Sequence, residues 1–247
     1  MVFLGLLAPP LVVAPYLQLG PDDQTGVRKS LTLVWFGHPG SEVMYDAGAG
    51  KKRVRAQDDG ARSTALLADL PPGRRFTYAI STRGTEWFRS DAVTPAGESQ
   101  SYRAVVIGDS GRGLPGQWAL AKALGKEQLS LLVHTGDIVY PRGTEQEYLS
   151  YHFPVYNAEP GAARGIPLLR QVTSVATPGN HDTLFRSPSV VEGGGLAYYR
   201  FWDAPFTGDH RDQPDPAQRL REKERGNFSF AWGPSWWVVL DANPYRQ

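Results

Sequence analysis

The sequence contains no cysteine, and this absence excludes disulfide scaffolds, thiolate zinc sites and cysteine nucleophiles. Histidine is scarce, with five residues in 247, so any metal ion would be held by oxygen atoms and imidazole. Charge of one sign is not in excess, because 26 basic and 25 acidic residues leave a formal net charge of +1. The chain therefore lacks the basic surplus of a nucleic-acid-binding protein, and we expect no nucleic-acid partner.

Long hydrophobic runs are missing as well. The apolar segment at residues 1–14 is shorter than the roughly 20 residues of a membrane span, and Pro9 and Pro10 interrupt it. The segment also lacks the basic start of a secretory signal peptide. A signal peptide and a β-strand leading into Pro15 are the two remaining interpretations, and we expect no membrane span.

The first part of the chain has the pattern of an all-β domain. Short β-prone runs, separated by turn residues, indicate an antiparallel β-sandwich of about 80 to 100 residues. The runs are residues 31–36, 42–46, 62–70, 75–82 and 86–93. A small, polar segment at residues 94–100 has the composition of a linker. We therefore predict a first domain at residues 1–97 and a second at 98–247.

The second part has an α/β pattern. Residues 103–111 and 129–137 are apolar runs that end in Gly-Asp, and residues 117–128 between them have helical spacing. Continuously apolar strands joined by a helix indicate a crossover unit in a sheet covered on its faces. Residues 144–153 predict another helix, with a capping box formed by Thr144 and Glu147. Residues 228–243 are expected to form consecutive strands.

Three apolar runs each end in a polar cluster, at Gly108-Asp109-Ser110-Gly111, Gly136-Asp137-Ile138-Val139-Tyr140 and Gly179-Asn180-His181-Asp182. In α/β sheets the loops after the carboxyl ends of the strands form the ligand crevice, so we expect these clusters to converge. Carboxylate, amide and phenolate oxygens are ligands for hard or borderline cations, and a carboxylate can bridge two of them. The sequence thus predicts an oxygen-rich metal site.

These clusters resemble the metallophosphoesterase superfamily, whose signature is G-D-x-[GH], then G-D, then G-N-H-[DE]. Tyr140, three residues after Asp137, is similar to the mark of the purple acid phosphatases. The P-Y-L-Q entry at residues 15–18 and the run at 226–243 look like bacterial members of that branch. The resemblance implies a fibronectin-type-III-like sandwich at 1–97, followed by a four-layer α-β-β-α metallophosphoesterase catalytic domain at 98–247.

The resemblance also implies residue roles. Asp109 and Tyr140 would bind a ferric ion, the tyrosine as the phenolate that gives the family its purple colour. Asp137 would bridge to a second, divalent ion (Fe, Zn or Mn), which Asn180 would also bind. His181 would contact the phosphate or the leaving group and act as the catalytic donor. The implied reaction is two-metal hydrolysis of a phosphate ester.

Three functions are consistent with these features: an acid phosphatase acting on phosphomonoesters, a phosphodiesterase or nucleotide pyrophosphatase of the same superfamily, and a non-catalytic binding or scaffold remnant. The resemblance favours the first, with an extracellular or periplasmic location. The alternatives without a metal are structural roles, in which the aspartates are turn residues and Tyr140 is a packed aromatic side chain. His134 is expected to be a core histidine, and His38 and His152 are expected to have structural or surface roles.

The sequence departs from the family in one respect. The family completes its site with V-x-x-H and G-H-x-H motifs, and neither occurs in this sequence; after His181 only His210 follows. Without them the second metal would keep only Asp137 and Asn180 as ligands. We therefore expect the catalytic domain to be incomplete, with poor metal binding by these 247 residues alone and apolar surface exposed on one side of the sheet.

Overall fold

The computed structural model describes residues 13–21, 29–183, 190–191, 195–203 and 227–243. Two sequence features lie outside these residues: the apolar segment at 1–12, and the charged segment at 208–226 that contains His210. Residues 13–19 form a strand, as one of the two interpretations of the amino terminus predicts. None of the described helices is long and apolar enough to cross a membrane.

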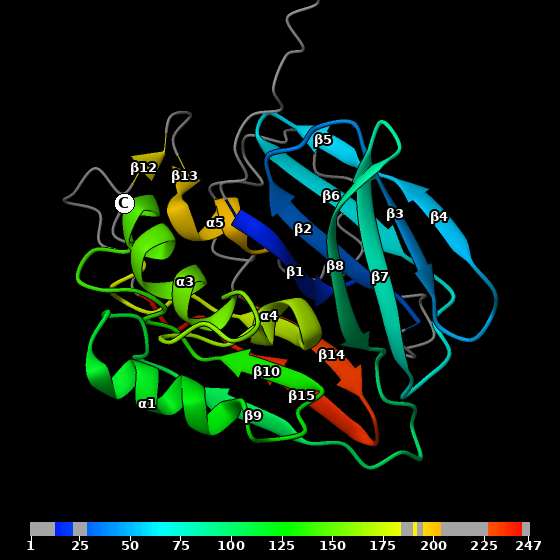
Figure 1. Ribbon diagram of the computed structural model, residues 1–247. Coiled ribbons are helices and arrows are strands. Elements are labelled where there is room, and N and C mark those ends of the chain that lie inside the picture. The colour runs from blue at the N-terminus through cyan, green and yellow to red at the C-terminus, as the bar shows by residue number, and fades with distance from the viewer. Residues whose placement is uncertain (1–12, 22–28, 184–189, 192–194, 204–226, 244–247) are drawn as a thin grey trace, which may run out of the picture.

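The region before residue 97 is a β-sandwich, and its strands coincide with the five predicted runs (Figure 1). These strands are β2 (Leu31–Phe36), β3 (Ser41–Asp46), β6 (Arg62–Leu67), β7 (Arg75–Thr82) and β8 (Thr85–Val93). Two further strands, β4 (Lys52–Arg55) and β5 (Gln57–Asp59), were not predicted because their residues are mostly charged or polar. One sheet has the order β4-β3-β7-β8 and faces a second sheet that contains β5, β6 and β2.

The second sheet continues beyond the sandwich. Strand β1 (Val13–Leu19) pairs antiparallel with β2 on one side and parallel with β11 (Thr173–Ala176) on the other. The result is one seven-stranded sheet with the order β5-β6-β2-β1-β11-β10-β9. A single strand therefore joins the sandwich to the α/β region. The domain boundary at residue 97 stays a prediction.

Strands β9 (Ala104–Ile107), β10 (Leu131–His134) and β11 are parallel, as the crossover pattern predicts. Helix α1 (Pro115–Leu124) connects the first two, with proline in its first turn, where a missing N–H costs no hydrogen bond. All residues of β10 and β11 are buried, as expected for central strands of a sheet that is covered on both faces, and the polar residues His134, Thr173 and Ser174 are buried with the apolar ones. Their carboxyl ends point to the same edge of the sheet.

The predicted helix at 144–153 is divided into three short pieces. These are α2 (Glu145–Glu147), a π-helical turn η1 (Tyr148–His152) and α3 (Phe153–Tyr156). The capping box is present, because Thr144 Oγ1 accepts from the Glu147 N–H and Glu147 Oε2 accepts from the Thr144 N–H. The remaining elements are α4 (Leu168–Gln171), β12 (Val190–Val191), β13 (Gly195–Leu196) and α5 (Ala197–Phe201).

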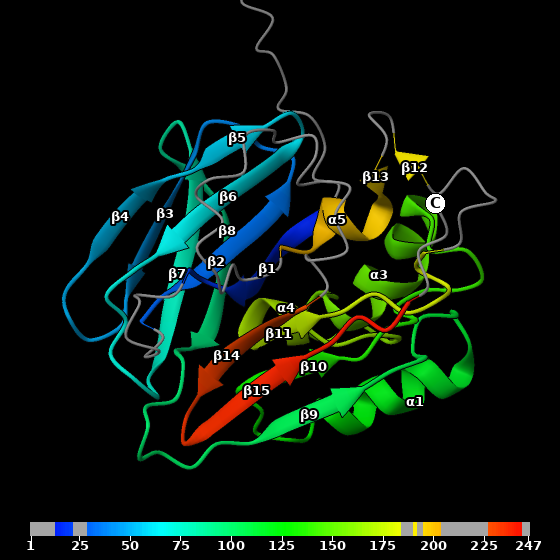
Figure 2. The ribbon, with the colours of Figure 1, turned by 180° about the vertical axis from the view of Figure 1, so that it is seen from behind.

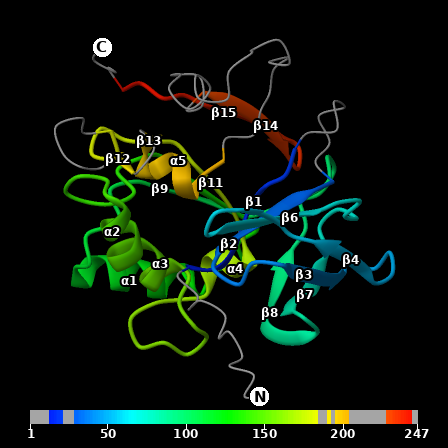
Figure 3. The ribbon, with the colours of Figure 1, turned by 90° about the horizontal axis from the view of Figure 1, so that it is seen from above.

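A hairpin formed by β14 (Phe228–Trp232) and β15 (Ser235–Val239) covers the face of the parallel strands opposite helices α1 and α3 (Figures 2 and 3). Its inward residues, Phe228, Phe230, Trp232 and Val239, join a core with Leu131, Val133 and Val175. Side chains alternate across a strand, so the outward side chains of this hairpin form the other face. Trp236, Val238 and Leu240 are exposed there by 61%, 62% and 69%. An exposed apolar stripe is thus present, as the sequence predicts.

Candidate metal centre

The three predicted clusters follow three adjacent parallel strands. Asp109 lies two residues after β9, Asp137 three residues after β10, and Asn180 four residues after β11. The β10 strand pairs with both neighbours in register, so the three strands end at the same level. The loops after them therefore meet at one edge of the sheet, although the clusters are far apart in sequence.

Asp109, Asp137 and Tyr140 meet at this edge through their oxygen atoms. The Tyr140 hydroxyl lies within hydrogen-bonding reach of Asp109 Oδ1 and 2.8 Å from Asp137 Oδ2. Asp137 is buried, with 9% of its surface exposed, whereas Asp109 is exposed. One phenol and two carboxylates, from two separate loops, thus share a small volume.

Both aspartates have the left-handed backbone conformation that non-glycine residues rarely adopt. The φ angles are +53° for Asp109 and +48° for Asp137. Such conformations cost about 1–3 kcal/mol each and persist only where the surroundings hold them. Hydrogen bonds hold this pair, from the Asp109 N–H to the Gly136 carbonyl and from the Tyr140 N–H to the Gly111 carbonyl. The first two clusters are therefore fastened to each other.

The third cluster approaches the second too closely for any side chain at Gly179. A Cβ atom added there would lie 2.2 Å from both the backbone nitrogen and Oδ1 of Asp137. Asn180 follows and is exposed, and the N–H of His181 donates to Asp137 Oδ1 at 2.9 Å. Asn180 is thus placed between two residues that contact Asp137, and among the described residues its own side chain forms no hydrogen bond to either aspartate.

The His181 imidazole lies beside the phenol, with 4.5 Å between its ring centroid and that of Tyr140. Its Nδ1 is 2.7 Å from the carbonyl oxygen of Pro141, and a carbonyl can only accept, so Nδ1 carries the proton. This hydrogen bond orients the ring and leaves Nε2 as the nitrogen that can face a ligand. The geometry suits a residue that donates to or accepts from a bound molecule.

The charges in the centre act on the phenol. Burial raises the pKa of Tyr140 above its ordinary value, and the hydrogen bonds to Asp109 and Asp137 raise it further. The phenol therefore keeps its proton unless a cation compensates the two carboxylates. Ionisation of Tyr140 requires a highly charged ion between these oxygens.

Asp182 belongs to the third cluster, but the sequence suggested no role for it. Its side chain is fully buried; Oδ2 accepts from the N–H groups of Gly179 and Ile138 at 2.8 and 3.1 Å, and Oδ1 accepts from the Tyr148 hydroxyl at 3.0 Å. Burial raises the pKa of this carboxyl to about 6, against the lowering effect of these donors. Asp182 thus ties the loop after β10 to the loop after β11.

Two histidines lie beneath the centre. His134 is buried on β10, and its Nε2 is 2.8 Å from the hydroxyl of Ser110, the residue after Asp109. His152 is fully buried 6.0 Å from it, centroid to centroid, among aromatic rings. Neither is placed among the Asp109, Asp137 and Tyr140 oxygens, which confirms the prediction that His134 is a core histidine. The Ser110–His134 contact has no sequence signature, because it depends on how two strands align.

The donor set fits a hard or borderline cation. Carboxylate and phenolic oxygens from Asp109, Asp137 and Tyr140 converge, and Asn180, which lies between Gly179 and His181 in sequence, carries an amide oxygen. In the part of the chain that the structure describes, no group of three or more His, Cys, Asp or Glu side chains could hold a metal ion. Tyr140 and Asn180 would therefore have to complete any site built on the two aspartates.

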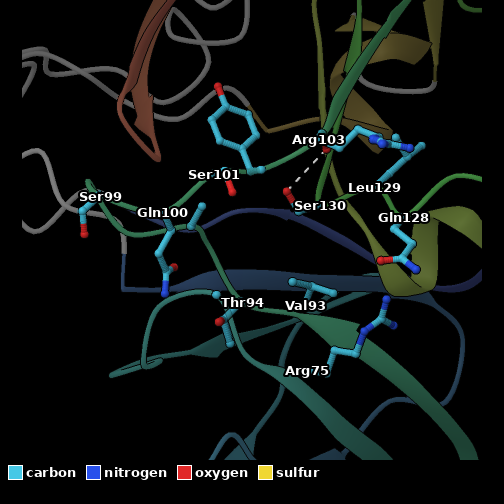
Figure 4. A pocket seen from close by; sticks show the side chains of 13 residues that line it. Arg75, Val93, Thr94, Ser99, Gln100, Ser101, Arg103, Gln128, Leu129 and Ser130 are labelled. Atoms are coloured by element: carbon cyan, nitrogen blue, oxygen red, sulfur yellow. Dashed lines mark hydrogen bonds between the residues drawn. The ribbon is translucent and has the colours of Figure 1, made fainter.

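A separate cavity lies between the end of the sandwich and the loop before β10, away from these residues (Figure 4). Its volume is about 500 Å³, and Arg75, Thr94, Gln100, Arg103 and Gln128 contribute polar groups to its lining. Arg103 forms an ion pair with Glu127, and the Ser130 hydroxyl donates to the Arg103 carbonyl. Since Asp109, Asp137, Tyr140, Asn180 and His181 do not line it, this cavity is not part of the candidate centre.

The chain thus has an α/β region in which the oxygen atoms of Asp109, Asp137 and Tyr140 cluster at the carboxyl edge of three parallel strands. The sequence profile described as calcineurin-like phosphoesterase matches residues 102–239, more than half of the chain. The chain therefore belongs to the calcineurin-like phosphoesterase family, the metallophosphoesterases.

Solved structures support the same fold. A purple acid phosphatase from yellow lupin (Lupinus luteus) seeds is 18% identical with a TM-score of 0.62, covering 95% of this chain and 47% of its own. PhoD is 15% identical with a TM-score of 0.60, covering 96% of this chain and 53% of its own. The chain thus spans about half the length of these two structures. A comparison with curated proteins finds no match.

Proposed function

We propose that the protein is a metal-dependent phosphoester hydrolase of the purple acid phosphatase type, which acts on phosphomonoesters with a dinuclear centre. The observation that carries this proposal is the position of the Tyr140 hydroxyl between the carboxylates of Asp109 and Asp137. Packing of the Tyr140 ring alone would not require its hydroxyl to contact two carboxylates.

In this proposal Asp109, Asp137 and Tyr140 hold a ferric ion, and Asp137 and Asn180 hold a divalent ion (Fe, Zn or Mn). When bound, the two ions supply the positive charge that polarises a phosphoryl group and lowers the pKa of water. The protein supplies the geometry. The backbone N–H of His181 donates to Asp137 Oδ1 and the Tyr140 hydroxyl donates to Asp137 Oδ2, and these two hydrogen bonds fix the orientation of the carboxylate that both ions would share.

In this proposal His181 donates a hydrogen bond and a proton to the substrate. Its Nδ1–H is occupied by the Pro141 carbonyl, so Nε2 contacts the phosphate or the leaving-group oxygen. A protonated imidazole can deliver its Nε2 proton to the departing oxygen while the hydrogen bond to Pro141 keeps the ring in place. His181 therefore acts on turnover rather than on metal binding.

Two substitutions separate these roles. Asp137→Asn removes the shared carboxylate charge and is expected to abolish metal content and turnover of an aryl phosphate together. His181→Ala is expected to lower turnover at least tenfold while the metal stays bound. Asp91→Asn is a matched control, because the exposed Asp91 carboxylate on β8 accepts a hydrogen bond from the Thr77 hydroxyl and lies outside the candidate centre. Full turnover in either variant, with metal content measured by elemental analysis, would refute the role assigned.

The ligand count supports a second proposal, that further metal ligands come from outside these 247 residues. Asp137 and Asn180 alone are too few for a stable divalent site, V-x-x-H and G-H-x-H motifs do not occur in the sequence, and the chain spans about half of two similar structures. The same added segment would supply the outer layer of an α-β-β-α fold. Sequencing of the neighbouring coding region tests this idea, which fails if no such histidine motifs are found.

A phosphodiesterase or nucleotide pyrophosphatase is the competing activity, since the same metal core serves both. Turnover of an aryl phosphate compared with that of a bis-aryl phosphate distinguishes them. If the full-length, folded protein bound no metal and hydrolysed neither ester, it would be a scaffold remnant instead. A location outside the cytoplasm and a fibronectin type III-like character of the sandwich complete the proposal, and cell fractionation tests the location.

A further inference from the structure

The loop after Asp109 carries an arginine to which neither the family signature nor the sequence assigns a role. Arg112 is exposed, and its guanidinium carbon lies 5.3 Å from the centroid of the Tyr140 ring. The hydroxyl of that ring contacts both aspartates. A positive group with five N–H donors is therefore placed next to the candidate metal centre.

The backbone of Arg112 is held in place by a buried side chain. Gln117 Oε1 accepts from the N–H groups of Arg112 and Gly113 at 3.0 and 2.7 Å, and Gln117 Nε2 donates to the Tyr151 carbonyl. Gln117 is only 6% exposed and belongs to the first turn of α1. The backbone of the loop is thus fixed between α1 and η1, at a position from which the Arg112 side chain reaches the Tyr140 ring.

We propose that Arg112 binds the phosphoryl group of the substrate and makes the site selective for monoesters over diesters. This inference rests on the proposed hydrolase function. A guanidinium binds two oxygens of one phosphate in a bidentate manner, and this pairing is strong because both partners are charged. A monoester offers three terminal oxygens, so two remain for Arg112 when one faces the metal ions that the aspartates would hold. A diester offers two and leaves only one.

The charge of the ligand leads to the same selectivity. A phosphomonoester carries close to two negative charges near neutral pH, since its second pKa is about 6, whereas a diester carries one. The Arg112 charge therefore stabilises the bound monoester more than the bound diester.

The alternative interpretation is that Arg112 only packs on the Tyr140 ring. Arg164 packs on Trp118 in this way, with 4.5 Å between its guanidinium carbon and the ring centroid.

The test uses the metal-loaded full-length protein and four variants: Arg112→Ala, Arg112→Lys, Gln117→Ala and Arg164→Ala. Binding of inorganic phosphate is measured by calorimetry, metal content by elemental analysis, and kcat/KM with an aryl phosphate and a bis-aryl phosphate. Arg112→Ala is expected to weaken phosphate binding about tenfold and to lower kcat/KM for the monoester about tenfold, with a smaller effect on the diester. Metal content should not change.

The other variants separate charge, position and packing. Arg112→Lys keeps the positive charge but lacks the bidentate guanidinium, so its phosphate affinity should lie between those of Arg112→Ala and the wild type. Gln117→Ala should weaken phosphate binding, because the loop backbone is no longer held. Arg164→Ala, the matched cation–π control, should behave as wild type. Wild-type phosphate affinity and ester preference in Arg112→Ala would overturn this inference alone. A wild-type protein without metal, phosphate binding or turnover would overturn the proposed function, and this inference with it.

Discussion

At the scale of single residues, Gly179 leaves the least room for a side chain among the three glycines that precede the key residues, because Asp137 lies against it. The sequence indicates a glycine before each key residue, and this much of the site could be predicted from the motif alone. The sequence could not predict which of these glycines is indispensable, because this depends on the distance between two loops that are more than 40 residues apart in sequence. Asp182 and the Ser110–His134 contact were missed for the same reason.

Gly179→Ala is expected to destabilise the protein by about 1–3 kcal/mol and to weaken metal binding, because the added methyl group would displace the Asp137 backbone. Gly116→Ala is the matched control, since a Cβ there meets no atom within 4 Å and alanine favours the helix. Urea unfolding and calorimetric metal titration measure the two effects. Equal stability and affinity in both variants would show that the loops can separate without cost.

At the scale of secondary structure, the elements with a regular apolar pattern were predicted and the polar ones were not. Strands β2, β7 and β14 begin and end where the sequence indicates, because each is apolar on its buried side. The capping box predicted the start of α2. The π-helical turn that follows could not be predicted, since it depends on the packing of Tyr148 and His152 against the core.

Two buried histidines, His152 in the π-helical turn and His134 on β10, make the stability of the protein depend on pH. Burial lowers the pKa of His152 well below its ordinary value and that of His134 to about 4. Both ring nitrogens of His152 have no hydrogen-bond partner among the described residues. Below about pH 6.5 the unfolded chain binds protons that these two histidines exclude in the folded protein, so their contribution to stability falls as the pH drops from 6.5 toward 4, whereas the raised pKa of Asp182 acts in the opposite direction. Each histidine contributes a slope of up to about 1.4 kcal/mol per pH unit.

His152→Phe is therefore expected to flatten the loss of stability between pH 6.5 and 4, measured by urea unfolding at several pH values. Tyr156→Phe is the control, because it changes another ring of the same cluster, 5.4 Å from His152, without removing a histidine. That variant should shift stability by a constant amount and keep the slope. Parallel curves for His152→Phe and wild type would show that His152 is not excluded from protonation in the folded state.

At the scale of the whole molecule, the outer face of β15 is the most apolar surface among the described residues of the α/β region. Trp236 and Val238 alternate with the inward side chains of this strand, and Leu240 directly follows its last residue, Val239. Contiguous apolar patches of this kind promote association or bind partners. The sequence predicted such a surface from the missing histidine motifs, but its position on β15 required the fold.

Replacing Trp236 and Val238 together by threonine is expected to reduce self-association and binding of a hydrophobic dye while leaving the free energy of unfolding within about 0.5 kcal/mol. Val239→Thr is the matched control, because Val239 is the neighbouring valine and only 7% exposed. That variant should cost about 1–2 kcal/mol, since it places a hydroxyl in the core. Light scattering and urea unfolding test both, and unchanged scattering in the double variant would contradict the prediction.

Strand β1 has a consequence for how the protein is made. Its partner β11 lies far along the chain, and the Ser174 hydroxyl donates to the Leu17 carbonyl across 157 residues. At the usual speed of a ribosome, β11 is synthesised on the order of 10 s after β1. During this interval β1 has only β2 as a paired strand, and its other edge is open to strands of other proteins in the cell. We therefore expect the nascent chain to expose this edge until residue 176 has left the ribosome.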